Sequence, residues 1–171
     1  NDIYDNNPIR EWVAEPIIFN PITDILLRYP ESIAFDSSGA IVVVSGNNQE
    51  VLKLKNNVKP ESALKNLPQG HSVEFPSGIC IGPLGELYIT DQSNHSIFWV
   101  YEGVTRTVYS ASKYKNGDVI EGQPTMPTSI RLNSFEEIIV LFVGDGSVRK
   151  FDRKGNQEIL LQPGVILDPS D

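Results

Sequence analysis

The sequence predicts an all-β protein, folded as a β-propeller of four-stranded antiparallel blades. Three observations predict this fold. A unit of 25 positions recurs without a gap, each unit contains three apolar runs of strand length, and no segment of ten or more residues shows a convincing helical apolar period. The units start near Pro30, Pro76 and Pro127, so they lie 46 and 51 residues apart. Repeats of this length that each build one small sheet are typical of propeller blades.

The three apolar runs of each unit predict three β-strands. Runs such as IVVV, IFWV and IIVLFV are rich in β-branched and aromatic residues and are nearly continuous, which indicates sheets buried on both faces. Turn-forming residues separate the runs and predict hairpins at residues 37–39, 46–48, 83–85, 92–94 and 144–146. A fourth run follows each unit, at residues 63–67, 105–111 and 158–161. Each unit therefore predicts a four-stranded sheet.

Both ends of the chain predict parts of a further blade. Residues 164–171 resemble the first strand and turn of a unit, and residues 1–29 resemble the remainder. We therefore expect a single propeller domain over residues 1–171, with about four blades' worth of chain. Two arrangements fit. One is a ring closed by a blade shared between the termini, which leaves no free sheet edge, and the other is a segment of a larger propeller.

The unit resembles the NHL repeat, whose pattern runs roughly P-x-G-I-A-V-D-x-x-G and then L/I-Y-V-x-D-x-x-N-x-R-I. The middle unit carries this pattern best, through Pro76, Gly78, Ile79, Gly85, Leu87, Tyr88, Ile89, Asp91, Asn94 and Ile97. The other two units are degraded, because Ser45 and Phe142 stand where the middle unit has Asp91. The resemblance implies a propeller, but it does not fix an activity, since one fold hosts many functions.

Charge and hydropathy argue against two classes of partner. The net charge is −8, with 22 acidic and 14 basic residues, and no long basic cluster is present, so nucleic acid is not expected as a partner. No run of 18 apolar residues predicts a membrane span.

The single cysteine bears on the cellular compartment. Cys80 cannot form an internal disulfide, and its flanking isoleucines predict a buried core position. This favours the cytosol, but an extracellular fragment without disulfides is also compatible with it. Asn94-His95-Ser96 is a glycosylation sequon, which matters only if the chain enters the secretory pathway.

One face of the propeller gathers the candidate metal ligands. The loops between second and third strands share this face with the loops that lead into each blade, which places His71 and His95 near Asp91. Two histidines and a carboxylate could hold zinc or a similar ion. The other interpretation, which we favour, makes both histidines turn residues, while Asp91 accepts backbone N–H groups at the end of its strand. No cofactor is therefore predicted, with a divalent cation as the alternative.

Two groups of enzymes with similar propellers suggest an alternative function. The amidating lyases hold zinc through several histidines, and two histidines are too few here. The gluconolactonase-like hydrolases hold a divalent cation near the axis through Glu, Asn and Asp, and the comparable residues here are Asp91, Asn94, Asn48 and Asp145. The last three fall at one equivalent turn position, where Asn and Asp suit the backbone conformation. We predict no catalytic residue, because no nucleophile elbow, phosphate loop or HExxH helix is present.

The long polar loop of residues 110–128 is the one conspicuous insertion, and loops on rigid scaffolds often carry recognition. Our leading hypothesis is a non-enzymatic scaffold that presents a loop face to a protein or peptide. The predicted binding residues are His71, Asp91, Asn94, His95, Tyr114, Lys115 and Asp118. The alternative is a metal-dependent hydrolase or lyase, gluconolactonase-like, with a site in the axial pocket.

Two further expectations concern partners and aromatic residues. A homo-oligomer is compatible with the sequence, and so is membership of a larger chain. Phe98, Trp99 and Tyr101 follow one another in the third strand of the middle unit. We expect them to pack between blades, with an exposed recognition patch as the other interpretation.

Overall fold

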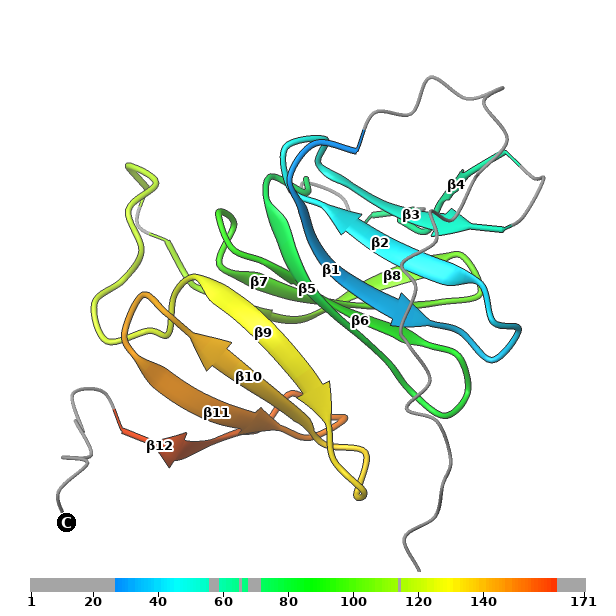
Figure 1. The fold of residues 1–171 in the computed structure, drawn as a ribbon. Helices are drawn as coiled ribbons and strands as arrows, with labels where there is room; N and C mark the ends of the chain where they lie inside the picture. Colours follow the sequence, from blue (N-terminus) through cyan, green and yellow to red (C-terminus); the bar gives the residue numbers. More distant parts are fainter. Residues whose placement is uncertain (1–26, 56–58, 65, 68–71, 114, 163–171) are drawn as a thin grey trace, which may run out of the picture.

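The computed structural model describes residues 27–55, 59–64, 66–67, 72–113 and 115–162. Within these ranges the chain forms twelve β-strands and no helix, so the predicted all-β class is confirmed. The strands form three four-stranded antiparallel sheets, called blades 1, 2 and 3 below (Figure 1). The prediction that residues 1–29 and 164–171 build a further blade falls almost wholly outside the described residues and stays a prediction.

The strands follow the three sequence repeats. Blade 1 contains β1 (Pro30–Phe35), β2 (Ile41–Ser45), β3 (Glu50–Leu54) and β4 (Glu61–Ser62). Blade 2 contains β5 (Pro76–Ile81), β6 (Leu87–Asp91), β7 (Ser96–Tyr101) and β8 (Val104–Ser110). Blade 3 contains β9 (Pro127–Leu132), β10 (Ile138–Phe142), β11 (Ser147–Phe151) and β12 (Gln157–Leu161). The first strand of each blade begins at the proline that opens the repeat.

The fourth strand of blade 1 departs from the prediction. It covers Glu61–Ser62, not residues 63–67. Its pairing with β3 ends where the N–H of Ala63 donates to the carbonyl of Val51 at 2.7 Å. Ala63 and Leu64 then pack against the apolar cluster between blades 1 and 2. Burial of these two side chains therefore takes the place of further strand pairing.

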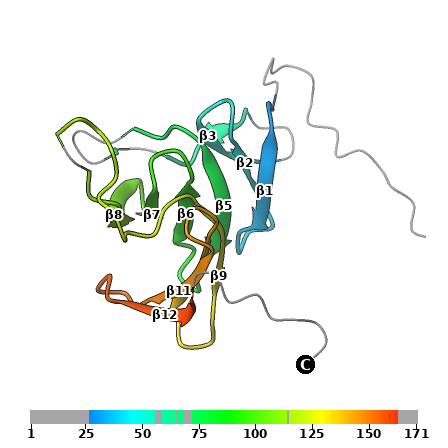
Figure 2. The ribbon, with the colours of Figure 1, turned by 90° about the vertical axis from the view of Figure 1, so that its left-hand side faces the viewer.

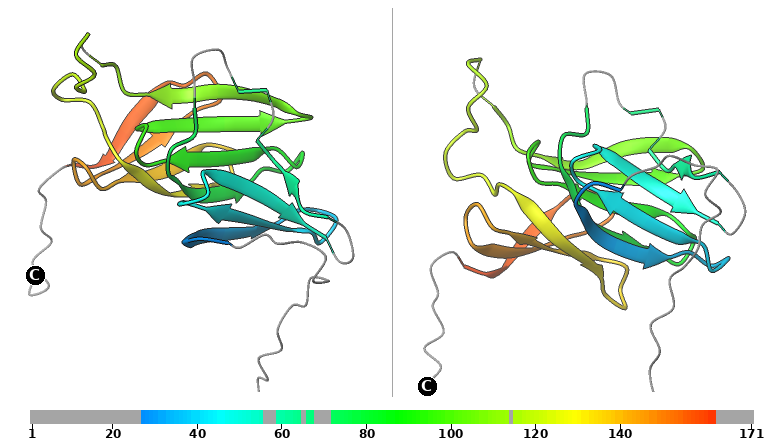
Figure 3. Two further views of the ribbon diagram at one scale, coloured as in Figure 1. Left: turned by 90° about the horizontal axis from the view of Figure 1, so that it is seen from above. Right: turned by 45° about the horizontal axis from the view of Figure 1, so that its top comes forward.

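The blades are arranged as in a propeller. Their first strands lie next to one another, with β5 in contact with both β1 and β9. The turned views in Figures 2 and 3 show the three sheets fanning out from these first strands. Because strand order in each sheet follows the chain, the fourth strand of each blade lies farthest from this centre.

Two apolar clusters join the blades. Blade 1 packs on one face of blade 2 through Val42, Val44, Val51, Ile79, Leu87, Ile89 and Val100. Blade 3 packs on the other face through Cys80, Tyr88, Ile97, Ile130, Ile138, Val140, Phe142 and Phe151. All five residues of β6 are buried, so the prediction of a sheet covered on both faces holds for blade 2. It does not hold throughout blade 1, where Ile33 and Phe35 are 61% and 63% exposed on the face away from blade 2.

Hydroxyl groups fix blade 2 against blade 3 near the centre. The Thr90 hydroxyl donates to the carbonyl of Thr128 at 2.7 Å and accepts from the N–H of Gly78 at 2.8 Å. The Ser77 hydroxyl donates to the carbonyl of Pro127 at 3.1 Å. A Cβ atom at Gly78 would overlap the Thr128 carbonyl oxygen, so glycine allows this close approach of the two blades.

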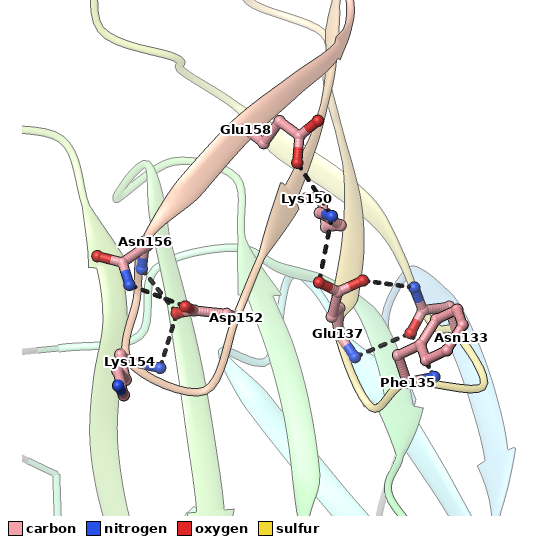
Figure 4. A network of polar contacts seen from close by, with 8 residues as sticks. All are labelled: Asn133, Phe135, Glu137, Lys150, Asp152, Lys154, Asn156 and Glu158. Carbon is pink, nitrogen blue, oxygen red and sulfur yellow. Dashed lines mark hydrogen bonds and ion pairs between the residues drawn. The ribbon is translucent and has the colours of Figure 1, made fainter.

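A short polar side chain caps the first hairpin turn in the same way in blades 1 and 3. In blade 1, Asp36 Oδ1 accepts from the N–H groups of Ser38 and Ala40, both at 2.9 Å. In blade 3, Asn133 Oδ1 accepts in the same pattern from the N–H groups of Phe135 and Glu137 (Figure 4). Short polar side chains at the start of a turn stabilise it through such bonds.

Blade 2 has no side chain at this position, because Gly82 stands there. The Glu86 carboxylate folds back into the space that a Gly82 side chain would occupy, and its Oε2 accepts from the N–H of Leu84 at 2.9 Å. Glu86 is only 4% exposed. The glutamate therefore replaces the missing aspartate or asparagine from four residues along the chain.

Candidate functional site

The turns between second and third strands lie beside the loops that lead into the blades, as predicted. The N–H groups of Gly46, Gln92 and Val143 donate to the carbonyls of Tyr29, Phe75 and Met126 at 2.9, 2.9 and 3.1 Å. Figure 1 draws these turns at the opposite end of the strands from the hairpin turns after β1, β5 and β9. We call this end the motif face, because it carries Asp91, Asn94 and His95.

Asp91 is fully buried at the motif face and holds the incoming loop. Its two carboxylate oxygens accept from the N–H groups of Glu74 and Phe75 at 2.8 and 2.9 Å. Asn94 donates from its backbone and its side chain to the same carboxylate, and its Nδ2 also donates to the carbonyl of Ser72 at 2.6 Å. The predicted role of Asp91 as an acceptor of backbone N–H groups is confirmed. Ligand binding by Asp91 or Asn94 would have to break these bonds.

His95 is part of a turn at the motif face. Its φ angle of 54° is left-handed, and its carbonyl accepts from the N–H of Ala111 at 3.1 Å. Its ring Nδ1 accepts from the N–H of Met126 at 3.2 Å, so the ring binds the loop leading into blade 3. Burial and the nearby Lys113 ammonium lower the pKa of His95, which favours the neutral ring that this bond requires.

The long insertion is tied into a compact hairpin. Lys113 pairs with Val119, and the side chain of Asn116 donates to Asp118 at 2.6 Å. Between described residues, no hydrogen bond or ion pair joins Lys115 or Asp118 to Asp91. His71 and Tyr114 lie outside the described residues, so binding at this loop face stays a prediction.

Asp145, another candidate for a metal ligand, is also engaged. Its Oδ1 accepts from the hydroxyl of Ser147 at 2.8 Å, and its Oδ2 forms an ion pair with Arg149 at 3.0 Å. Across the described ranges, no group of three or more His, Cys, Asp or Glu side chains could hold a metal ion. His71, the other histidine of the predicted metal set, lies outside the described residues.

A cleft of about 370 Å³ opens between blades 2 and 3, at the end of the strands away from the motif face. Blade 2 contributes Tyr88, Trp99, Tyr101 and Arg106 to its lining, and blade 3 contributes Ile138, Phe151 and the turn after β11. Pockets of this size can hold a small ligand or an anchoring side chain. We call this hollow the interblade cleft.

Strand register places the side chains of the cleft. Glu102 and Gly103 both have positive φ angles, 49° and 76°, as a two-residue hairpin turn requires. This turn pairs Tyr101 with Val104, and therefore Trp99 with Arg106. On the other side Trp99 pairs with Tyr88.

These pairs form an aromatic and cationic row on the face of blade 2 that meets blade 3. The Arg106 guanidinium carbon lies 5.3 Å from the centroid of the Trp99 ring, within the range of a cation–π contact. The rings of Trp99 and Tyr101 have centroids 5.8 Å apart. Burial and the adjacent Glu86 carboxylate raise the pKa of Tyr88, so its hydroxyl stays protonated at neutral pH.

The wall from blade 3 consists of capped turns. Asp152 accepts from the N–H groups of Lys154 and Asn156 at 2.8 and 2.9 Å, which fixes the turn between β11 and β12 (Figure 4). Arg153 of this turn forms an ion pair with Glu136 of the turn between β9 and β10. The cleft therefore lies between two blades whose loops are short and internally bonded.

Sequence reasoning favoured packing for the aromatic run in β7, and the structure divides that run. Phe98 is fully buried, as expected for packing between blades, whereas Trp99 and Tyr101 are half-buried and line the cleft. The signal that could have found the cleft is the register of the Glu102-Gly103 turn, which sets Arg106 opposite Trp99. The sequence contains no comparable signal for the burial of the Glu86 carboxylate beside Gly82.

Comparison with known proteins gives the same repeat. Residues 74–100, from the loop before blade 2 to β7, match the family model of the NHL repeat. Blade 2 contains an NHL repeat. The resemblance expected from Pro76 to Ile97 is thus confirmed, and the two flanking blades share its architecture. A comparison of the sequence with curated proteins found no match.

Solved structures with a similar fold are propellers. A virginiamycin B lyase from Staphylococcus aureus is similar with a TM-score of 0.60 and 16% identity, over 78% of this chain and 41% of the lyase. A candidate gluconolactonase is similar with a TM-score of 0.62 and 12% identity, over 79% of this chain and 49% of that protein. The chain thus spans less than half of either protein, and at these identities the likeness concerns the fold. Among the described residues, no helix is long and apolar enough to span a membrane.

Proposed function

We propose that this chain is a non-enzymatic binding module for a protein or peptide, and that the interblade cleft is its binding site. The observation that supports the proposal is the row of Tyr88, Trp99 and Arg106, which opens into a cleft of about 370 Å³ between two packed blades. Aromatic and arginine side chains are enriched at the energetic centres of protein interfaces.

The rigidity of the surroundings also supports binding at this site. The two walls belong to blades joined by a buried apolar cluster and by the hydroxyl contacts of Thr90 and Ser77. A preformed site loses less conformational entropy when it binds a partner. The loop face, with Lys115 and Asp118, remains a second predicted site for the same kind of partner.

A displayed library of random peptides tests the proposal. We expect the wild-type protein to enrich a shared peptide motif, and Trp99→Ala to lose it because the aromatic platform is gone. Phe35→Ala is the matched control, since Phe35 is an exposed aromatic residue of blade 1 that does not line the cleft. Enrichment that survives Trp99→Ala but not Lys115→Ala would move the site to the loop face. If the wild type enriched no motif at all, peptide binding would be contradicted.

The alternative function, a metal-dependent hydrolase or lyase with a gluconolactonase-like axial site, rests on likeness of fold alone. It predicts a divalent ion bound in a one-to-one ratio after purification. Elemental analysis with a thermal-shift titration of Zn²⁺ and Ca²⁺ separates it from the binding module, because only a metalloprotein should gain stability at stoichiometric ion.

A further inference from the structure

The charges that line the interblade cleft are unevenly partnered. Its three carboxylates are all engaged: Glu86 caps a turn, Asp152 caps another, and Glu136 forms an ion pair with Arg153. In contrast, no ion pair within the described part of the chain joins Arg106 or Lys154 to a carboxylate. The cleft therefore carries two cations without an ion pair among the described residues, Arg106 from blade 2 and Lys154 from blade 3. The pKa of the Asp152 carboxyl is lowered mainly by the hydrogen bond from the Asn156 side chain, and the Lys154 ammonium is close enough to help lower it.

The position of Arg106 suits the binding of an anion. Its guanidinium carbon lies 5.3 Å from the centroid of the Trp99 ring, and a guanidinium that stacks on a ring keeps its N–H donors available at its edge. A guanidinium oriented in this way can donate two parallel hydrogen bonds to one carboxylate. Arg106 is exposed, so a ligand can reach it from solvent.

The floor beside these cations is apolar. Tyr88, Ile138 and Phe151 are 6%, 2% and 1% exposed and belong to the cluster that joins the blades. A ligand that fits both features has an anionic group next to an apolar group. The last residue of a polypeptide has this form, because its α-carboxylate and its side chain leave the same carbon atom. An internal Asp or Glu fits less well, since neighbouring side chains of an extended peptide point to opposite sides.

We infer that the interblade cleft binds the C-terminus of a partner polypeptide that ends in an apolar residue. Arg106 binds the α-carboxylate, Lys154 adds positive potential, and the last side chain lies against the aromatic row. Capture of a terminal carboxylate is a known mode of peptide recognition. The inference rests on the proposed function and names the part of the partner that the cleft takes.

Paired peptides test this inference directly. The probes are fluorescein-labelled hexapeptides Gly-Ser-Gly-Ser-Gly-Phe, made once with a free C-terminal carboxylate and once as the amide, and the same pair ending in Ser. By fluorescence anisotropy, we expect the Phe acid to bind about tenfold or more tightly than the Phe amide, because a charge-assisted bidentate contact is lost in the amide. The Ser acid should bind more weakly than the Phe acid.

Variants assign the effect to the cleft. Arg106→Gln should reduce binding of the Phe acid to the level of the amide and leave amide binding unchanged. Arg131→Gln is the matched control, because it removes an exposed arginine of blade 3 that does not line the cleft. Equal binding of acid and amide, or an acid preference that survives Arg106→Gln, would overturn the inference.

Two outcomes separate this inference from the proposed function. If displayed peptides still depend on Trp99 while acid and amide bind equally, the binding module stands and terminal recognition falls. If N-acetyl-phenylalanine binds as tightly as the hexapeptide acid, the cleft recognises a small apolar carboxylate and the polypeptide part of the inference is contradicted.

Discussion

At the motif face, Asp91 and Asn94 direct their polar groups to neighbouring backbone, whereas in the interblade cleft Arg106 is exposed and has no ion pair among the described residues. The difference separates two tasks within one blade. The residues that make the NHL repeat recognisable hold the incoming loop and the turn. In the proposed binding row, Tyr88 belongs to the repeat pattern, whereas Trp99 and Arg106 stand at positions that the pattern leaves free. Substitutions at the two ends of blade 2 should therefore have opposite profiles of stability and binding.

The largest effect is expected at the motif face. Asp91→Ala should lower the free energy of unfolding by about 3 kcal/mol, because it removes a fully buried carboxylate and leaves the N–H groups of Glu74 and Phe75 without their acceptor. Chemical denaturation measures the change. Asp118→Ala, on the exposed long loop, should change stability by less than about 0.5 kcal/mol. Equal stability of the two variants would show that Asp91 does not hold the loop.

A smaller effect is expected at the turn that Glu86 caps. Glu86→Ala should cost about 1 kcal/mol through the lost bond to the N–H of Leu84, and Gly82→Asn should also destabilise, because its side chain meets the Glu86 carboxylate. The double variant should recover most of this loss, since it recreates the pattern of blade 1, where the oxygen of a short side chain at residue 36 caps the turn and Ala40 stands at the position of Glu86. A double-mutant cycle by thermal unfolding measures the coupling. Simple additivity of the two changes would contradict this account of the turn.

A pH dependence is expected from His95. Its pKa in the folded protein lies below the ordinary 6.5, so the unfolded chain binds more protons as the pH falls through this range. Its contribution to stability is complete above about pH 6.5 and is lost progressively as the pH falls from there towards the folded pKa. Unfolding midpoints measured between pH 7.5 and pH 5 should show a slope that His95→Gln reduces. An unchanged slope in that variant would assign the dependence to other groups.

The smallest effect on stability is expected in the cleft. Arg106→Gln should lower the free energy of unfolding by less than about 1 kcal/mol, because an exposed cation–π contact contributes little. The same protein should lose its preference for a free C-terminal carboxylate. Measuring both quantities on one preparation tests the comparison itself, and a large loss of stability would place Arg106 among the structural residues.

Much of the fold could be predicted from local patterns. The repeated prolines mark the starts of β1, β5 and β9, and the apolar runs give the inner strands because burial on two faces leaves a continuous signal. The fourth strand of blade 1 was misplaced, since apolar residues such as Leu64 serve inter-blade packing as well as strand pairing. Asp91 was interpreted correctly, because a polar residue at a strand end has a local partner.

The cleft could not be predicted in the same way. It depends on how far blade 3 stands from the row of Tyr88, Trp99 and Arg106, and that distance is set by packing between residues far apart in sequence. The role of Glu86 was missed for a similar reason. The repeat alignment shows that Gly82 lacks the capping side chain that Asp36 and Asn133 provide in the other blades. It does not show that the Glu86 carboxylate fills the same space.

Because Cys80 lies between blades 2 and 3, the rate at which its thiol reacts reports how often these two blades separate. Cys80 lies in the cluster between these two sheets and is only 8% exposed, and burial raises the pKa of its thiol to about 12, so very little reactive thiolate is present while the sheets are closed. An alkylating reagent should therefore modify it mainly when the two sheets separate. The rate of alkylation therefore reports how often the sheets separate, and a ligand that contacts both sheets should lower that rate.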